Sequence, residues 1–425
     1  MRPWLRETFT SLRVQQYRAL WYGITLNFGA LWFSIVARGF LAFELTESTT
    51  ALGALSLGFG IPMLLLAPVG GAVADRLSRR TLVILGYASF ALVNGVQAVL
   101  ILAGVIDIWM LFAGAVVEGA AVAFTIPSRQ ALIGDLVEED ELGNAIALSM
   151  VSFNAMRVAA PSIAGALIAV AFVGVGGTFA LTSVMYVASV VTIMRVRPGE
   201  AKPSEGRASP LADIVQGVRY VRGRPAILVL VVIAYALELT AFTYFIFVPA
   251  VVSELFDLGS IELGVLTTAI GVGAFGASLV AARIVDGRHA WGVHALSSLV
   301  FGLLLMAFAL SPVYAVALFV GVWLGATETG FLSLNQSLAM RFCDREYYGR
   351  VQAVLMFGFA LNGIVALPVG VLADSAGLRE ALFALGAAGT LLVVAALLFA
   401  RRVDAQADAL TPGERARRAD TIAAS

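Results

Sequence analysis

Long apolar runs alternate with short polar segments along almost the whole chain. Each run holds about 20 mostly apolar residues, which is the length that a helix needs to cross a bilayer. We therefore predict an all-α integral membrane protein. Twelve transmembrane helices are expected, at residues 19–43, 51–73, 82–105, 108–126, 142–170, 177–194, 227–252, 263–285, 292–310, 313–334, 351–373 and 381–400.

The composition favours a membrane protein over a soluble one. Of the 425 residues, 60% are hydrophobic and 13% are charged, whereas soluble domains contain about 25% charged residues. The net charge of zero gives no reason to expect nucleic-acid binding. Cys343 is the single cysteine, so an intrachain disulfide or a thiolate zinc cluster is excluded, and we expect no metal and no cofactor. His289 and His294 fall near one predicted membrane boundary, where solvated or interfacial side chains are expected.

The basic residues predict the orientation. With a cytoplasmic N-terminus, 25 of the 28 Lys and Arg residues lie in cytoplasmic segments, and only Arg379 lies in a segment on the other side. Under the positive-inside rule, we expect a multi-pass protein of the cell membrane with both termini in the cytoplasm. The first 20 residues contain four arginines and no short apolar region with a cleavage site, so no cleaved signal peptide is expected.

The chain also repeats weakly at an offset of 206 residues. Gln130 matches Gln336 and Gly143 matches Gly349, around the loop between the fourth and fifth helix of each half. Two halves in the same orientation form a parallel repeat, a plan of many transporters in which the substrate path lies between the halves. We predict an N-terminal six-helix bundle at 1–195, a cytoplasmic linker with an amphipathic helix at 196–225, a C-terminal six-helix bundle at 226–402 and a disordered cytoplasmic tail at 403–425.

The loop after the second span reads GGAVADRLSRR at residues 70–80. It resembles the loop motif of the major facilitator superfamily, which is Gly, three residues, Asp-Arg, one residue, Gly and two basic residues, with Ser78 in place of the second glycine. The segments at 44–49 (ELTEST) and 127–168 resemble the branch that holds macrolide exporters, the enterobactin exporter and lysophospholipid transporters. The resemblance implies the major facilitator fold and a cytoplasmic gate between the halves, formed by Gly71, Asp75, Arg76, Arg79 and Arg80. Positive-inside anchoring alone is the alternative for the arginines.

One further segment resembles a motif of this superfamily, and another repeats an earlier segment of the same sequence. APSIAG at 160–165 is similar to the antiporter motif of drug exporters, and its Pro161 and Gly165 favour a helix kink and tight helix packing. A plain kink is the alternative interpretation. A second segment repeats an earlier one: Pro368-Val369-Gly370 with Ala373-Asp374 is similar to Pro68-Val69-Gly70 with Ala74-Asp75. Because Asp374 falls on the other side of the membrane, we interpret it as a helix end.

Charged residues inside the predicted spans are the sharpest local signal. Each costs about 2.5–3.5 kcal/mol at a lipid-facing midplane, so all five should face protein or a water-filled cavity. In the superfamily fold, the first and fourth helices of each half line the cavity, and four of the five charges fall on those helices. The five residues are Arg38, Glu118, Arg157, Glu238 and Glu328.

These charges suggest distinct roles. Glu118 and Arg157 are candidates for an ion pair, which is either structural or part of the transport chemistry. Glu238 has no basic partner at the same depth in its own half and is the leading candidate for a proton carrier, ahead of Glu118. Arg38 is a candidate for binding an anionic substrate group. Asn27 and Asn154 either line the cavity or bond between helices. Aromatic residues of the first and seventh spans are candidates for an apolar substrate wall, namely Phe33, Phe40, Phe242, Tyr244, Phe245 and Phe247.

The function that follows is secondary transport. We predict a monomeric, proton-coupled exporter of amphipathic small molecules such as drugs or siderophores, with the lipid bilayer and the substrate as its partners. A lysophospholipid transporter or an importer of an anionic small molecule is the alternative. A membrane receptor or scaffold is disfavoured by the charges within the spans, and an enzyme is not expected because no phosphate-binding loop or metal-ligand cluster occurs in the sequence.

Overall fold

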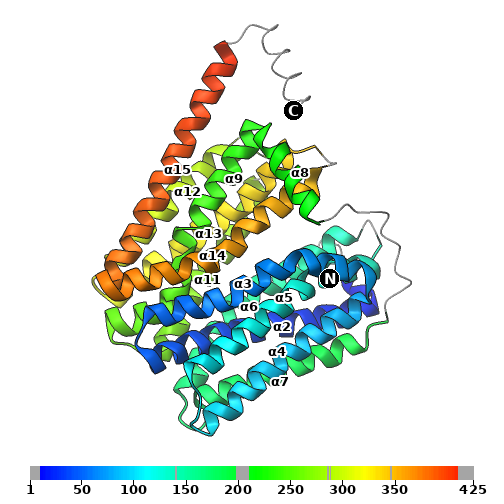
Figure 1. Ribbon diagram of the computed structural model, residues 1–425, viewed down its shortest axis with the longest axis vertical. Coiled ribbons are helices and arrows are strands. Elements are labelled where there is room, and N and C mark those ends of the chain that lie inside the picture. The colour runs from blue at the N-terminus through cyan, green and yellow to red at the C-terminus, as the bar shows by residue number, and fades with distance from the viewer. Residues whose placement is uncertain are drawn as a thin grey trace, which may run out of the picture.

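The regular structure of the described chain is helical. The computed structural model describes residues 10–138, 141–197, 210–284, 287, 289–344 and 347–409, and all regular elements in these ranges are helices (Figure 1). The N-terminal half contains η1 (Thr10–Arg13), α2 (Gln15–Thr46), α3 (Thr49–Arg76), α4 (Arg79–Leu102), α5 (Ile108–Leu136), α6 (Leu142–Ala169) and α7 (Gly174–Met194). The C-terminal half contains α9 (Pro225–Glu238), η2 (Ala241–Phe247), α10 (Val248–Ala250), η3 (Val251–Leu255), α11 (Ser260–Ile284), α12 (Ala290–Ala309), α13 (Tyr314–Phe342), α14 (Tyr348–Ala376) and α15 (Leu378–Ala409).

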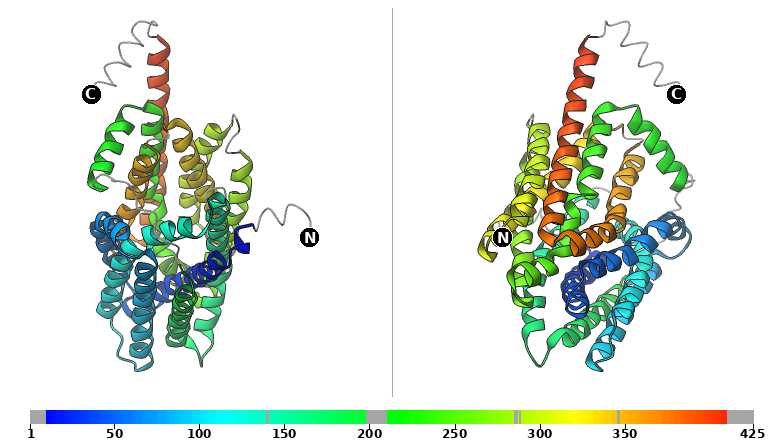
Figure 2. Two further views of the ribbon diagram at one scale, coloured as in Figure 1. Left: turned by 90° about the vertical axis from the view of Figure 1, so that its right-hand side faces the viewer. Right: turned by 60° about the vertical axis from the view of Figure 1, so that its left-hand side comes forward.

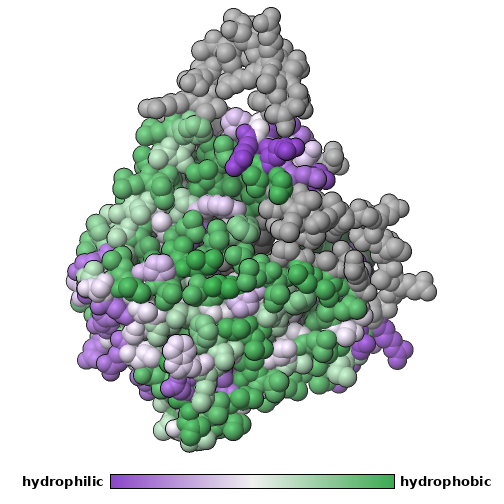
Figure 3. Space-filling model, viewed as in Figure 1, coloured by the Kyte–Doolittle hydropathy of each residue, from purple (hydrophilic) through white to green (hydrophobic). Residues whose placement is uncertain are grey.

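The prediction of an all-α membrane fold is confirmed. Eleven helical segments within the described residues are long and apolar enough to cross a membrane, and α14 adds a shorter apolar stretch, Leu361–Ala376. Large apolar side chains such as Leu92 and Leu391 are exposed on the outside of the helices, and apolar residues cover much of the face in Figure 3. So much exposed apolar surface is unfavourable in water and matches the hydrocarbon core of a bilayer.

Polar residues at the ends of the apolar runs start and stop the helices. The side chains of Ser48, Ser78 and Asp107 accept hydrogen bonds from the first-turn amides of α3, α4 and α5, respectively. These bonds satisfy amide donors that lack a partner within the helix. Between α14 and α15, Gly377 has a φ of 106°, a conformation that residues with a Cβ rarely adopt.

The seventh span differs from the single helix predicted at 227–252. The α-helix ends at Glu238, and the chain continues as the 3₁₀-helix η2, the short α10 and the π-helical turn η3. Pro249 lacks an amide donor, and the Thr240 hydroxyl bonds back to the carbonyl oxygen of Ala236, which competes with regular helix geometry. The span therefore changes its helix type within the membrane.

The segments on either side of the C-terminal half also add to what the sequence predicted. Helix α8 (Pro210–Arg222) lies within the predicted linker and packs on α14. Helix α15 continues to Ala409, although the disordered tail was predicted to begin at position 403, and its last turns extend past the other helices (Figure 2). Residues 410–425 lie outside the described part of the chain.

The two halves pack along two seams. Helix α3 packs on α14, and α6 packs on α11. We call the end of the molecule that carries α8, the start of α2 and the end of α15 the linker end, and we call the opposite end the far end. The ribbons of the halves meet at the far end and diverge toward the linker end (Figure 1).

The apolar core shows the same asymmetry. One large cluster combines buried residues of both halves, such as Leu41 and Leu263, and most of its members lie toward the far end. Two smaller clusters lie toward the linker end. One belongs to the N-terminal half and contains Leu132, and the other belongs to the C-terminal half and contains Leu338. The halves therefore share a core at the far end and have separate cores at the linker end.

Candidate functional site

The first intramembrane ion pair joins Arg38 and Glu118. Arg38 Nη2 lies 2.6 Å from Glu118 Oε2, and the two side chains are 13% and 9% exposed. Arg38 also donates to the Ser34 hydroxyl (3.1 Å), and Asn94 donates from Nδ2 to Glu118 Oε1 (2.9 Å). Because α2, α4 and α5 supply all of these groups, this network is internal to the N-terminal half.

The second ion pair crosses between the halves. Arg157 Nη2 on α6 lies 2.7 Å from Glu328 Oε1 on α13, and the two side chains are 10% and 9% exposed. The Tyr244 hydroxyl donates to Glu328 Oε2 (3.3 Å), and the Arg157 guanidinium lies 5.7 Å from the centre of the Trp32 ring. Removing one partner of such a buried pair is strongly destabilising, because the other charge stays buried without compensation.

The suggested pairing of Glu118 with Arg157 is therefore wrong. Each residue pairs with another partner, because the fold places α13 of the other half beside Arg157 and gives Glu118 the arginine of α2. Arg38, a candidate for anion binding, is already neutralised by Glu118 in this structure. Both arginines have a buried Nε without a hydrogen-bond partner among the described residues.

Glu238 occupies the position where the seventh span leaves the α-helical conformation. It is the last residue of α9, is 5% exposed, and its Oε2 has no hydrogen-bond partner among the described residues. The side-chain amide of Asn362 on α14 donates to the Glu238 main-chain oxygen (3.2 Å), so α14 contacts the chain at this break. The break thus holds a buried carboxylate that no basic residue pairs with in the described part of the chain.

The other residues predicted to line a cavity are more scattered. Asn27 is buried in α2 and Asn154 is half-buried in α6, and neither bonds to the charged residues above within the described chain. The predicted aromatic wall forms in part. Phe245 meets Trp32 edge-on across the halves, with ring centres 5.8 Å apart. Other members of the wall, such as Tyr244, pack into the C-terminal half against Phe301.

The gate motif is described in part. The side chains of Asp75 and Arg76 lie outside the described part of the chain, as do the surroundings of Gly71. Arg79 forms an ion pair with Asp135 of α5, and Arg80 donates to the Ile193 and Met194 carbonyl oxygens at the end of α7. In this structure, both arginines therefore tie together helices of the N-terminal half.

The antiporter-like motif lies on the second seam. Helix α6 continues through Pro161, and a Cβ on Gly165 would overlap the Ser260 carbonyl oxygen of α11. The Ser162 hydroxyl donates to the Thr268 hydroxyl (2.7 Å) across the same seam. Small residues here let the two halves approach backbone to backbone.

We expect Gly165→Val to prevent this close approach, because the overlapping atom belongs to the backbone. In a Cys343→Ser protein, Ser162→Cys and Thr268→Cys should form a disulfide readily, and Gly165→Val should sharply lower its yield. Gly276→Val is the matched control, since a Cβ on Gly276 of α11 meets open space. Equal cross-linking in both valine variants would contradict this role of Gly165.

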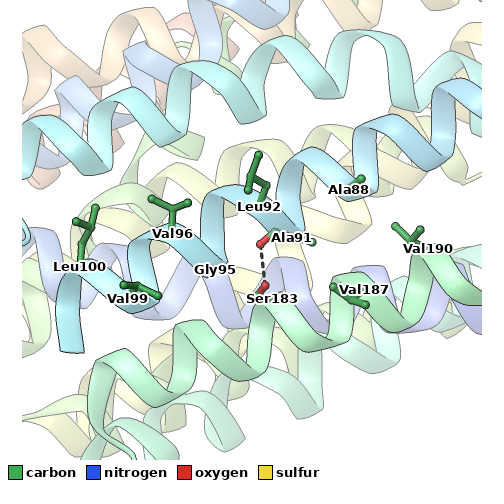
Figure 4. Close-up of a pocket in the computed structure, with 10 residues that line it drawn as sticks. All are labelled: Ala88, Ala91, Leu92, Gly95, Val96, Val99, Leu100, Ser183, Val187 and Val190. Carbon is green, nitrogen blue, oxygen red and sulfur yellow. Dashed lines mark hydrogen bonds between the residues drawn. The ribbon is translucent and has the colours of Figure 1, made fainter. Parts of the chain in front are cut away.

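Two hollows lie away from the charged residues. A pocket of about 600 Å³ between α4 and α7 is lined almost wholly by apolar side chains, and the Ser183 hydroxyl in it donates to the Ala91 carbonyl oxygen (Figure 4). A second pocket, of about 490 Å³, lies at the far end between α2 and the end of the seventh span, and its lining includes Glu44, Glu47 and Glu254. Neither lining contains an ion-paired residue of the spans.

Sequence reasoning missed or misjudged three features. Trp32 was not singled out, although it touches both Arg157 and Phe245. The helix break after Glu238 was hidden in a continuous apolar run. His294 was expected at an interface, but it is buried between α12 and α13, where its Nε2 lies 3.0 Å from Asn335 Oδ1.

Comparison with known proteins identifies the family of this chain. Residues 6–421 match the major facilitator family described as transmembrane secretion effector. The chain belongs to this family. This major facilitator transporter is 22% identical to the staphyloferrin A transporter of Staphylococcus aureus. The match runs over 352 residues and covers 82% of this chain and 87% of that protein. It is also 24% identical over 208 residues to the uncharacterized transporter YfiS of Bacillus subtilis, where the match spans about half of each protein, 46% of this chain and 47% of YfiS.

Solved structures share the fold at low sequence identity. A bacterial homologue of the human lysosomal transporter Spinster, solved in an inward-facing and unoccupied conformation, has a TM-score of 0.72 at 14% identity, with 97% of this chain and 100% of that chain covered. The nucleoside transporter NupG has a TM-score of 0.73 at 12% identity, with 90% and 99% covered. The protein is thus a multi-pass membrane transporter with the major facilitator fold.

Proposed function

We propose that this transporter is a proton-coupled exporter of amphipathic small molecules. Glu238 carries the proposal, because it is a buried carboxylate with an unpartnered oxygen at a break in a membrane span. An ionised carboxylate without a basic partner is costly to bury, and binding a proton removes that cost. The proton gradient then supplies the energy, and no cofactor is needed.

The two halves provide the conformational change. The shared core at the far end and the separate cores at the linker end correspond to a state that opens at the linker end. Alternating access requires a second state that opens at the far end. A proton on Glu238 shifts the balance between the two states only if it stabilises one more than the other. The break after Glu238 supports this coupling, since a change of helix type alters the position of the far end of the seventh span.

The orientation follows from the basic residues. We infer that the linker end faces the cytoplasm and that both termini lie there, because almost all Lys and Arg residues outside the spans belong to segments at this end. The structure then corresponds to the inward-facing state of a cell-membrane exporter. Substrate would enter from the cytoplasm, and the far end would release it outside.

The substrate class is inferred from the site and from a relative. Trp32 and Phe245 place aromatic surface beside the charged Arg157–Glu328 pair, an arrangement that suits a molecule with both apolar and charged parts. The relative named as a staphyloferrin A transporter supports a siderophore among the candidates. Drugs, lysophospholipids and import of an anionic molecule remain as outcomes of the test.

The test is accumulation of a compound panel in an efflux-deficient bacterium. The panel contains staphyloferrin A, a catecholate siderophore, a macrolide, a tetracycline, ethidium and a lysophospholipid, each with and without an uncoupler. A Glu238→Gln protein at matched expression is the uncoupled control. We expect lower accumulation of one compound, lost in the control and on uncoupling. Raised accumulation of a compound would establish import, and an effect that persists after uncoupling would exclude the proton gradient as energy source.

A further inference from the structure

Asp374, interpreted from the sequence as a helix end, bonds to the other half of the molecule. It lies in the last turn of α14, and its carboxylate accepts from the main-chain amides of Thr49 (2.7 Å) and Thr50 (3.0 Å) at the start of α3. It also accepts from the hydroxyls of Ser48 (2.6 Å) and Thr49 (2.5 Å). Four groups of the N-terminal half thus converge on one carboxylate of the C-terminal half.

Helix termini make this contact stronger than an ordinary polar contact. The first amides of a helix lack partners within the helix, and the helix dipole favours a negative charge there. Ser48 already caps α3 from within the N-terminal half by accepting from the Ala51 amide. Asp374 adds the bonds to Thr49 and Thr50 and supplies the charge, so α3 completes its N-terminal cap with a residue of the opposite half.

The contact lies at the far end of a tightly packed seam. A Cβ on Gly53 would overlap the Ala366 carbonyl oxygen, and one on Gly370 would lie 2.5 Å from the Thr49 carbonyl oxygen. The Thr49 hydroxyl oxygen also lies 2.8 Å from the Gly370 carbonyl oxygen, so its single proton is shared between that oxygen and Asp374. The bonds to Asp374 therefore exist only while α3 and α14 are closed against each other at this end.

The same sequence pattern ends both helices of the seam. Near the end of α3 the pattern is Gly71, two residues, Ala74 and Asp75. Near the end of α14 it is Gly370, two residues, Ala373 and Asp374. The first residues of α3 lie against the last turns of α14, so the two helices run in opposite directions and the pattern falls once at each end of the seam. Asp75 belongs to the gate motif at the linker end.

The geometry points to Asp374 as a latch of the transport cycle, which holds the far end closed by capping α3 and releases it when the far end opens. This inference rests on the alternating access proposed above, but not on the substrate or the coupling ion. Its bonds favour the state that opens at the linker end, and their loss shifts the population toward the state that opens at the far end.

The test measures opening of the far end directly in the purified full-length protein. In a Cys343→Ser background, Ala366→Cys provides a reporter thiol that is fully buried in the seam. We expect Asp374→Asn to raise the rate at which a hydrophilic maleimide labels this thiol by about three- to tenfold, the range set by losing one or two modest hydrogen bonds. Thr49→Val weakens the latch from the other half and should act in the same direction, so the proposal stays testable if one variant folds poorly.

Controls separate a latch from general loosening. Asp107→Asn removes a carboxylate that caps α5 at the same end but within one half, and it should leave the labelling rate unchanged. Ala98→Cys places a thiol at a buried position of the N-terminal half, and Asp374→Asn should not affect it. Unchanged labelling of the Ala366→Cys reporter in both latch variants would overturn the proposal, as would a parallel rise at position 98. Labelling needs no transported compound, so this outcome is independent of the accumulation panel.

Discussion

Arg157→Gln is expected to destabilise the protein strongly, by about 3–5 kcal/mol, because it leaves Glu328 buried without a counter-charge. The remaining bond from Tyr244 does not neutralise the carboxylate. The pair also links α6 to α13, so its loss weakens the attachment between the halves. The measurement is the thermal unfolding midpoint of the purified protein in detergent, compared with wild type.

The double variant Arg157→Gln/Glu328→Gln tests whether the unpaired charge of Glu328 causes the loss of stability. Two neutral amides leave no unpaired charge, so most of the lost stability should return. Arg224→Gln is the matched control, since it breaks an ion pair with Asp344 whose side chains are 49% and 58% exposed. Exposed pairs contribute about 0–1 kcal/mol, so only a small change is expected there. A double variant as unstable as Arg157→Gln would refute the role of the unpaired charge.

The surface around α8, proposed to be cytoplasmic, has its own polar cluster, which lies next to the native thiol of Cys343. The Tyr220 hydroxyl bonds to the Asp344 carboxylate (2.9 Å), and Tyr220 stacks on Tyr347 with ring centres 4.1 Å apart. Burial raises the pKa of the Tyr220 hydroxyl and that of the neighbouring Cys343 thiol. Cys343 is therefore less thiolate-like than an exposed cysteine and should react slowly.

The spans could be predicted from the sequence because their signal is local. Runs of about 20 apolar residues, ended by capping residues such as Ser48 and Asp107, fix helices without knowledge of the fold. The charged residues inside the runs could be singled out for the same reason, since each is costly in lipid. The partners of these charges could not be predicted in this way. Arg157 meets Glu328, 171 positions later in the chain, only because α6 and α13 pack across the halves.

Helix breaks and contacts between the halves lack a comparable local signal. The run from 227 to 252 is continuously apolar, so hydropathy does not reveal where α9 ends. Thr240 and Pro249 are the residues that could have indicated the break, through back-bonding and a missing amide donor. Asp374 is an ordinary helix-end residue in the sequence. Its bonds to α3 depend on a closure of the two halves that no single segment encodes.

Glu238→Gln tests the proposed coupling most directly. Glutamine keeps the size of the side chain but takes up no proton, so it mimics the protonated carboxyl permanently. Vesicles that contain the wild-type protein should show a pH change in the lumen when the compound identified by the accumulation panel is added. The Glu238→Gln protein should show no pH change above protein-free vesicles. Compound exchange between the two sides at equal concentrations should persist, because that exchange requires no net proton movement.

The matched control for this prediction lies on the same span. Glu254→Gln neutralises an exposed carboxylate of η3, and it should leave the pH change intact. Glu238→Asp should retain coupling, since it keeps a carboxyl group at the break. Glu238→Gln vesicles that still change pH on addition of the compound would assign the proton to another group. The buried Glu118 would then be the next residue to test, because a proton on its carboxylate would remove the charge that Arg38 pairs with.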